Sequence, residues 1–275
     1  MRLLFLLIFM LFSTSSVANN VVFPGYGSDD YSAELLKHVL SYKQKNKYQV
    51  QFNNQNLPKN RVLTLISNNA GISVISAGAT KEREKLLLPI RFPILKGLNG
   101  WRIALVTKEN KDIFLKHSTL TAFKLLTPGQ LHSWSDTKVI ASNDINVEGG
   151  SSYDGLFPML ENNRFDYFPR SILEVRWEYE KHKDRNIIIE PYQLIHYPAA
   201  YFFYVNKSNT KLAADISSGL EKALKDGSFE RIFNKYFGSA IKKVQQEKRR
   251  VFSLANPFLL SQVPLSRSEL WLDLH

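Results

Sequence analysis

The chain has 275 residues, 44% hydrophobic and 22% charged, with no cysteine, a composition that excludes disordered, collagen-like and disulfide-stapled proteins. The absence of cysteine also excludes thiol nucleophiles, thiolate metal sites and iron–sulfur chemistry. A formal net charge of +11 favours anionic partners in general without identifying one.

The first eighteen residues are typical of a targeting segment. Arg2 precedes an apolar run over residues 3–12, and the small-residue triplet Ser16-Val17-Ala18 follows. This order predicts a cleavable secretory signal peptide over residues 1–18, because a bilayer-spanning helix needs about 20 apolar residues. Since no cysteine is available for a lipid anchor, we expect a freely diffusing mature chain that begins near Asn19.

The mature chain opens with alternating strands and helices. Hydrophobic periodicity and capping residues predict strands at 21–23, 48–52 and 72–76 and helices at 31–45 and 58–69. This order favours an α/β fold with a mainly parallel sheet. Two extended segments follow, at 86–93 and 101–107, with Gly97 and Gly100 as pivots between them.

The pattern of helices and strands then restarts. It predicts helices at 119–126, 136–142, 153–162 and 172–182, a turn at 128–129, and strands at 145–147, 164–168, 187–190 and 201–205. Pro158 lies inside one of these helices, where we expect a kink or a break. Two α/β units joined by extended segments predict two lobes with a cleft between them.

Two helices and a basic tail complete the chain. The helices are predicted at 210–224 and 229–237, the second ending at Gly238. The tail begins as a basic helix over 241–251, for which we expect a solvated face. A docking surface for anionic lipid or a membrane partner is the alternative.

The sequence lacks the common catalytic and metal-binding patterns. No two of its six histidines have the helical spacing of a zinc site, and there is no Gly-x-Ser-x-Gly, phosphate-binding loop or dinucleotide fingerprint. Paired carboxylates remain open, because such pairs need not be close in sequence. These absences favour binding over catalysis and predict no metal and no cofactor.

Three segments resemble one protein family. The stretch Thr80-Lys81-Glu82-Arg83 resembles the Thr-x-x-Arg of family 3 periplasmic solute-binding proteins, the amino-acid type. Asn163-Arg164-Phe165-Asp166-Tyr167 is similar to the family's Gly-Arg-x-Asp-Ala element, and residues 212–238 resemble its two closing helices. The resemblance covers about Val21 to Gly238.

The resemblance implies a two-lobed type 2 periplasmic-binding fold, each lobe a mainly parallel sheet flanked by helices, followed here by a C-terminal extension. We expect lobe 1 to comprise residues 19–98 and 206–248, lobe 2 residues 99–205, and a separate tail residues 249–275. The lobes would close by a hinge motion around residues 97–101 and 198–201.

The resemblance also implies a ligand site. Arg83, with Thr80, would hold a ligand α-carboxylate from lobe 1, since a guanidinium matches a carboxylate bidentately. Tyr26 stands where the family has an aromatic that stacks on the ligand. Trp134 and Asp136 fall where the family has a Gly-Thr-Thr turn, and Asp136 or Ser135 would cap a helix facing the cleft.

Arg170 departs from the family pattern, because amino-acid binders have near this position an aspartate that pairs with the ligand's ammonium group. If Arg83 and Arg170 both face the cleft, a ligand with two anionic groups is favoured. Alternatively, Glu174, one helical turn later, pairs with Arg170 and leaves a locally neutral site.

We therefore expect a monomeric periplasmic solute-binding protein that captures a small anionic or amino-acid-like ligand for an ABC-type transporter or a membrane sensor, without nucleic acid. One alternative is an enzyme on the same fold, dehydratase-like or peptidoglycan-lyase-like, with Glu174 or Glu148 as a buried general acid beside Arg83. A second is a degenerate sensory or scaffold protein that has lost its ligand.

Overall fold

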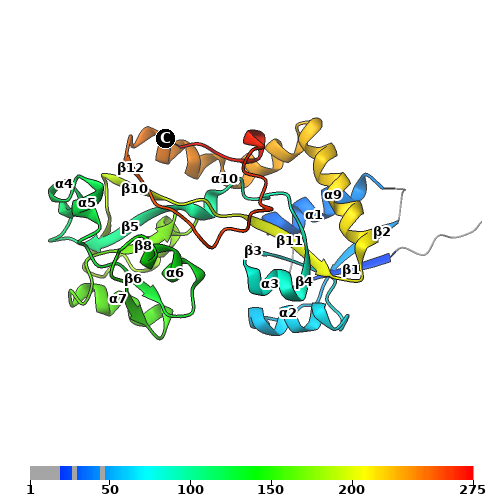
Figure 1. The fold of residues 1–275 in the computed structure, drawn as a ribbon, viewed down its shortest axis with the longest axis horizontal. Helices are drawn as coiled ribbons and strands as arrows, with labels where there is room; N and C mark the ends of the chain where they lie inside the picture. Colours follow the sequence, from blue (N-terminus) through cyan, green and yellow to red (C-terminus); the bar gives the residue numbers. More distant parts are fainter. Residues whose placement is uncertain (1–18, 27–29, 44–46, 275) are drawn as a thin grey trace, which may run out of the picture.

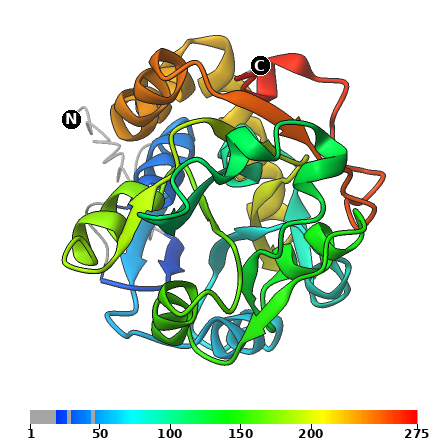
Figure 2. The ribbon, with the colours of Figure 1, turned by 90° about the vertical axis from the view of Figure 1, so that its left-hand side faces the viewer.

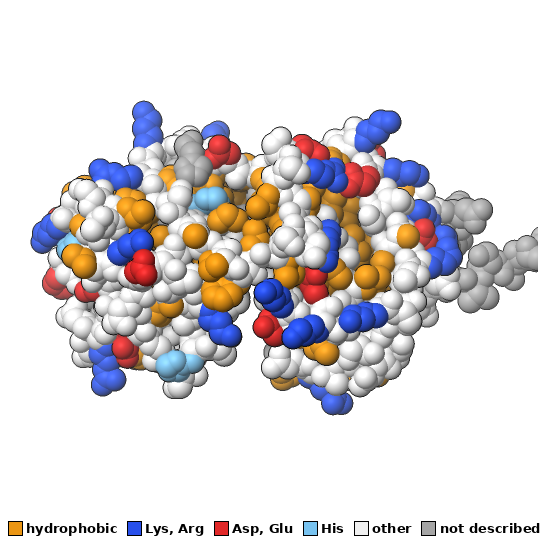
Figure 3. All heavy atoms as spheres, viewed as in Figure 1, with side chains coloured by type: hydrophobic (Ala, Val, Ile, Leu, Met, Phe, Trp, Pro, Cys, Tyr) orange, Lys and Arg blue, Asp and Glu red, His pale blue; other side chains and the backbone are white. Residues whose placement is uncertain are grey.

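The computed structural model describes residues 19–26, 30–43 and 47–274, so the predicted signal peptide lies outside the described residues. Helices and strands form two lobes that lie side by side (Figure 1). A space-filling view shows a notch between them, with charged side chains at its margins (Figure 3). We call it the interlobe notch. The prediction of a two-lobed α/β fold is confirmed.

Lobe 1 contains a three-stranded sheet in the order β3-β11-β4 and a two-stranded sheet of β1 and β2. A hydrogen bond of 2.8 Å from the Ser73 amide to the Val22 carbonyl connects the two sheets. Its elements are β1 (Asn19–Phe23), α1 (Tyr31–Ser41), β2 (Tyr48–Phe52), α2 (Lys59–Ser67), β3 (Val74–Gly78), α3 (Lys81–Leu86), β4 (Leu87–Ile90), β11 (Tyr201–Asn206), α9 (Thr210–Lys225) and the first half of α10 (Ser228–Gln246).

Lobe 2 is built around β5 (Trp101–Thr107), a fully buried strand that pairs antiparallel with β8, β9 and β10. The lobe also contains η1 (Leu98–Gly100), α4 (Ile113–Lys116), α5 (Leu120–Phe123), β6 (Gly129–Leu131), α6 (Ser135–Ala141), β7 (Glu148–Gly150), α7 (Tyr153–Glu161), β8 (Phe168–Ser171), α8 (Val175–Lys181), β9 (Ile187–Ile189), β10 (Gln193–His196) and β12 (Arg250–Ser253).

The sheets are mixed, so the expectation of mainly parallel sheets is wrong. The pairs β1-β2, β6-β7 and β10-β12 are parallel, whereas β11 runs antiparallel to both β3 and β4. The reason is the path of the chain. It leaves lobe 1 through β4 and β5 and returns through β10 and β11, so that each returning strand pairs antiparallel to an outgoing one.

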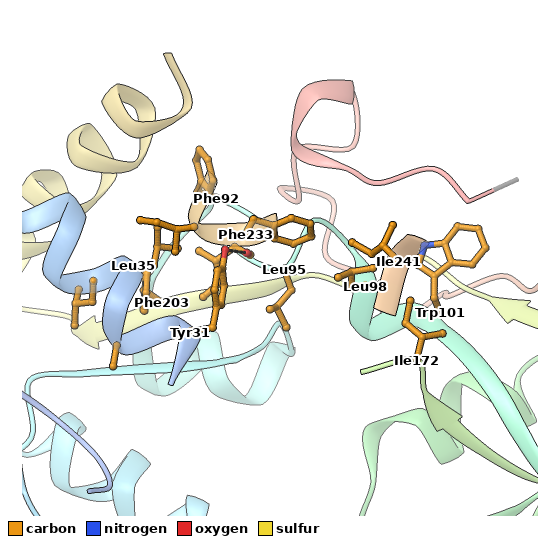
Figure 4. Packing of buried hydrophobic residues seen from close by; sticks show 14 of the residues in the cluster. Tyr31, Leu35, Phe92, Leu95, Leu98, Trp101, Ile172, Phe203, Phe233 and Ile241 are labelled. Carbon is orange, nitrogen blue, oxygen red and sulfur yellow. Dashed lines mark hydrogen bonds between the residues drawn. The ribbon is translucent and has the colours of Figure 1, made fainter. Parts of the chain in front are cut away.

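One hydrophobic cluster extends from the core of lobe 1 through the junction into lobe 2. Figure 4 shows Tyr31 and Phe203 of lobe 1 at one end, Trp101 at the other, and Leu95 and Leu98 of the connecting segment between them. The lobes therefore share a core at their junction.

Glycine is needed where the two connecting segments touch. A Cβ atom on Gly100 would lie 2.0 Å from the Tyr197 carbonyl oxygen, which excludes any other residue there. Gly97 has a φ of +77°, and its Cβ would lie 2.9 Å from Trp271. Close packing thus accounts for both glycines that the sequence had suggested as pivots.

The sequence predicts that this helix ends at Gly238, but α10 continues to Gln246. Gly238 takes a helical conformation instead of the left-handed one that usually ends a helix. The first half of α10 packs Phe233 on Tyr31 of lobe 1. Beyond Gly238, Ile241 reaches the junction near Trp101, as Figure 4 shows.

Residues 247–274, which we call the C-terminal strap, bind to both lobes. Glu247 pairs with Arg176 of α8, and β12 pairs with β10 in lobe 2. The chain then returns to lobe 1, where Val263 joins a buried cluster and the Arg267 guanidinium binds Glu221 of α9 at 2.6 and 2.9 Å. Figures 1 and 2 both place α10 and the C-terminal end of the strap at the top of the molecule, and the middle of the strap descends between them.

The expected lobe boundaries need two corrections. β11 belongs to the sheet of lobe 1, so residues 201–205 do not close lobe 2. Residues 249–275 were expected to be a separate tail, but their described part includes β12 of the lobe 2 sheet and η2 (Ser268–Leu270), which lies against lobe 1. Strand periodicity indicates a strand but not the sheet that it joins.

Several element bounds in lobe 2 also differ. Of the strand expected at 164–168, only Tyr167 makes a bridge, to Pro128, before β8 begins. The turn expected at 128–129 leads directly into β6, and the helix expected at 172–182 starts at Val175. Helix α7 continues through Pro158 instead of breaking there.

Candidate functional site in the interlobe notch

Arg83 lies on α3, the short helix that follows β3 of lobe 1. The helix begins where Thr80 Oγ1 accepts a hydrogen bond of 3.2 Å from the Arg83 amide. Thr80 is thus an N-cap, which the Thr-x-x-Arg spacing explains because an N-cap oxygen bonds to the amide three residues later. Helix α3 faces α6 of lobe 2 across the interlobe notch (Figure 1).

The Arg83 side chain is partly buried and has no acidic partner among the described residues. Its Nε and Nη1 atoms are buried and make no hydrogen bond, and no acidic side chain in the described part of the chain forms an ion pair with it. Its nearest aromatic neighbour is Tyr204, whose ring centre lies 6.0 Å away. Burial lowers the pKa of Arg83. Buried polar atoms are normally paired, so these two donors suit an acceptor that the chain does not supply.

Lys59, at the start of α2, adds a second cation near Arg83. It is exposed over much of its surface, yet the surrounding protein partly desolvates its ammonium group and lowers its pKa to about 8. The positive charge of Arg83 lowers the pKa of Lys59 further, while the negative charge of Asp136 in lobe 2 raises it. Groups from both lobes therefore act on one another across the notch.

On the lobe 2 side, Asp136 binds Arg102 of β5 at 2.6 Å. The side chain of Arg102 is 9% exposed, and although burial lowers its pKa, the charge of Asp136 raises it above the usual value. Asp136 lies in the first turn of α6, whereas Trp134 occupies the cap position without a side-chain cap bond. The expectation that Asp136 or Ser135 caps this helix is therefore wrong.

Arg170 is saturated by acidic partners of its own lobe. Its Nε and Nη2 atoms bind the two carboxylate oxygens of Glu178 at 2.7 and 2.6 Å, and Nη2 also binds Glu174 at 2.9 Å. The guanidinium lies 4.6 Å from the ring centre of Trp134. The geometry corresponds to the Glu174 alternative, with Glu178 as a stronger partner, and Arg170 does not form a second anion clamp.

Tyr26 is separate from the other predicted residues. It has 71% of its surface exposed, and no hydrogen bond or ring contact in the described part of the chain joins it to Arg83 or Trp134. The structure thus brings Arg83 and Asp136 to opposite sides of one notch, with Lys59 and Arg102, which the sequence did not single out. For Lys59, the sequence offered one signal, its place just after Pro58 at the start of α2. For Arg102, the only signal was a charged residue within an otherwise apolar strand.

Neither carboxylate suggested as a general acid is buried beside Arg83. Glu148 is exposed on β7, and the Glu174 side chain is 52% exposed and paired with Arg170. Within the described ranges, no group of three His, Asp or Glu side chains could hold a metal ion. The cations Arg83 and Lys59 make the arrangement suited to binding an anionic group.

A family model, that of the bacterial extracellular solute-binding proteins, family 3, matches residues 31–239. The chain belongs to this family. The recognition of family 3 from the sequence is thus confirmed, and the match ends just before the last turns of α10, so the strap lies beyond it. No curated protein sequence matches the chain.

Three solved structures of similar fold are remote in sequence. A probable amino-acid ABC transporter extracellular-binding protein from Bacillus subtilis has a TM-score of 0.58 at 17% identity, over 80% of this chain and 98% of that one. An ancestral arginine-binding protein bound to arginine has 0.55 at 18%, over 79% and 98%. A histidine kinase sensor domain has 0.54 at 13%, over 80% and 97%.

This solute-binding protein has no membrane-crossing helix in its described part, since none of those helices is both long and apolar enough. The relatives are covered almost whole, while about a fifth of this chain has no counterpart in them. The family match ends at residue 239, before the strap begins.

Proposed function

We propose that this family 3 protein is a periplasmic solute-binding protein that holds a small carboxylate ligand in the interlobe notch, with Arg83 as the carboxylate anchor. The observation that carries the proposal is the pair of buried, unpartnered donors on Arg83. A carboxylate can accept two parallel hydrogen bonds from a guanidinium, one from Nη2 and the other from either of these two donors.

The charges around the notch support an anionic or zwitterionic ligand. Arg102 is compensated by Asp136 and Arg170 by Glu178, whereas no acidic side chain among the described residues forms an ion pair with Arg83 or Lys59. Glu174 shares Arg170 with Glu178 and remains half exposed, so its carboxylate is available to a ligand ammonium group. An amino acid would use Arg83 and Glu174, and a dicarboxylate would use Arg83 and Lys59.

We further propose that ligand binding closes the lobes about the two connecting segments and that a membrane partner recognises the closed form. Closure can be driven only by contacts that the ligand makes better in the closed state. Both an ABC transporter binding protein and a kinase sensor domain occur among the similar structures, and either kind of partner fits the fold.

The test is a thermal-shift screen of the chain from Asn19 on, with L-amino acids, dicarboxylates and small phosphates. A ligand that binds only the folded state raises the midpoint by mass action. Loss of Arg83 in Arg83→Gln should remove about 2–3 kcal/mol of binding, or roughly 30- to 150-fold in affinity. Arg61→Gln, an exposed arginine on α2, is the matched control.

The two ligand classes separate in the same experiment. Glu174→Gln should weaken an amino acid and spare a dicarboxylate, whereas Lys59→Met should do the opposite. If no compound stabilises the protein, or if Arg83→Gln leaves the affinity of the ligand unchanged, the proposed site is wrong.

A further inference from the structure

The end of lobe 2 farthest from lobe 1 carries a group of exposed leucines. Leu115, Leu120 and Leu125 expose 48, 39 and 78% of their surfaces, all on α4, α5 and the turn after α5. Phe114 and Phe123 of the same helices are fully buried and fix the segment on the lobe. Single apolar side chains are ordinary on a surface, whereas three exposed leucines in one short segment offer an apolar contact for a partner.

A basic hollow adjoins these leucines. It has a volume of about 210 Å³, and its lining includes Leu115, Tyr192, Lys248 and Arg250. Arg250 Nη1 donates a 2.6 Å hydrogen bond to the Ser118 carbonyl, a neutral acceptor that leaves its charge uncompensated. Glu247, the acid at the hollow, is already held by Arg176 and Arg249.

The backbone at the hollow is strained. Lys248 follows the C-terminal end of α10 with a φ of +48°, in the left-handed region where glycine or asparagine is favoured. Its side chain is exposed. A lysine therefore occupies a position where glycine or asparagine would be less strained, and the turn directs the chain from α10 into β12.

Near the leucines, exposed lysines outnumber acidic residues. Lys108, Lys111 and Lys116 are exposed, while the nearby Glu109 and Asp112 accept hydrogen bonds from Asn186 and Tyr192 at 2.8 and 3.1 Å. We call the three leucines, these lysines and the hollow the leucine–lysine face.

We propose that the leucine–lysine face docks on the surface of an anionic phospholipid bilayer. The leucines would enter the boundary between headgroups and acyl chains, and Lys248 and Arg250 would bind a lipid phosphate in the hollow. Apolar side chains among flexible lysines suit a fluid, negatively charged surface. A protein partner of fixed shape would require a larger continuous patch, of about 800 Å² on each side.

The test is flotation of the chain from Asn19 on, with vesicles of phosphatidylcholine alone or with phosphatidylglycerol added. Binding should require the anionic lipid and fall with added salt, because ions screen exposed charges. The double variant Leu120→Gln/Leu125→Gln should lower the affinity for anionic vesicles by roughly tenfold or more. Leu265→Gln, on the strap and 52% exposed, should bind like the unaltered protein.

A charge variant tests the hollow separately. Lys248→Gln should weaken vesicle binding by about fivefold, since a basic residue near an anionic surface contributes about 1 kcal/mol. Lys225→Gln, exposed on α9 of lobe 1, should leave it unchanged. The proposal is overturned if the unaltered protein ignores anionic vesicles, binds neutral ones equally well, or loses binding as much in the control variants. The vesicle experiment does not measure ligand binding, so its outcome does not depend on the site proposed in the notch.

Discussion

Arg170 and its acidic partners form a buried ion cluster next to the notch. The side chains of Arg170 and Glu178 are 7 and 3% exposed, and Tyr153 donates a further hydrogen bond of 2.9 Å to Glu178. Burial of either charge alone would destabilise the fold, because the charge would lose its hydration with no opposite charge to compensate for that loss.

Arg170→Leu is therefore expected to destabilise the fold by about 3–5 kcal/mol, because it leaves Glu178 buried and unpaired. Arg185→Leu breaks the more exposed ion pair with Glu161 and should cost about 1 kcal/mol or less. Urea denaturation of both variants measures the difference. Equal losses would contradict the burial argument, and Arg170→Leu/Glu178→Leu should recover much of the stability.

If the notch binds an anionic ligand as proposed, Lys59 should make that binding pH-dependent. With a pKa of about 8, its ammonium group is charged below pH 8 and neutral above it. Affinity for an anionic ligand is thus expected to be highest below pH 7 and to fall by about fivefold as the pH rises through 8, since about 1 kcal/mol of attraction is lost. Calorimetric titration should find this fall removed in Lys59→Met and retained in Lys225→Met.

At the residue level, local patterns in the sequence predicted what depends on short spacing. Thr80 and Arg83 are three residues apart, so their relation as cap and capped amide follows from the helix itself. Arg102 and Asp136 meet only because β5 and α6 pack in the same lobe. The pairing of Arg170 with Glu178 was missed for a similar reason. Arg170 lies on β8 and Glu178 on α8, so the turn between the strand and the helix decides whether the two side chains meet.

Among the elements, the two long C-terminal helices contain one glycine each in contrasting environments. In α9, a Cβ on Gly219 would lie 2.2 Å from the Val39 carbonyl oxygen of α1, so the two helices touch through the missing side chain. In α10, the nearest atom to a Cβ on Gly238 is Asn234 Cβ, at 3.6 Å, an ordinary contact.

Alanine at these two positions should have effects of opposite sign. Gly219→Ala is expected to destabilise the protein by about 1–3 kcal/mol through overpacking. Gly238→Ala should stabilise it by about 0.5–1 kcal/mol, since alanine is the better helix former. Thermal and urea unfolding measure both, and a loss of stability in Gly238→Ala would contradict a continuous α10.

The sequence predicted where strands and helices lie better than it predicted which strands pair with one another. The aromatic and β-branched run at 201–205 indicated a strand, and β11 is there, but only the returning path of the chain makes it the central strand of lobe 1. The basic residues at 241–251 indicated a helix, yet the chain turns into β12 at Arg250, because that edge of β10 is open to a partner.

At the scale of the whole molecule, the strap ties the lobes together outside the family's fold. Trp271 packs over Gly97, and its Nε1 donates a 2.9 Å hydrogen bond to the Pro264 carbonyl. The Leu272 amide donates to the Lys96 carbonyl at 2.9 Å, which pins the end of the strap to the segment joining the lobes.

Trp271→Ala should therefore loosen the junction as well as destabilise it. We expect a loss of about 2 kcal/mol, equivalent to about 4–8 °C in melting temperature, and a wider interlobe distance. Because the chain has no cysteine, labels on Lys85→Cys and Lys138→Cys report that distance by energy transfer. Phe258→Ser, at an exposed strap residue, should change neither quantity; an unchanged distance in Trp271→Ala would contradict the role of the strap.

The route of the chain between the lobes also bears on how the protein folds. Lobe 1 lacks its central strand until residue 206 has been made, and lobe 2 lacks an edge strand until residue 253. Neither lobe is a continuous stretch of sequence, so neither can be completed on its own early in synthesis. Contacts between such distant residues slow folding. The sheets of both lobes are therefore complete only when nearly all of the chain has been made, and until then the fold that would resist threading through a narrow pore is unfinished.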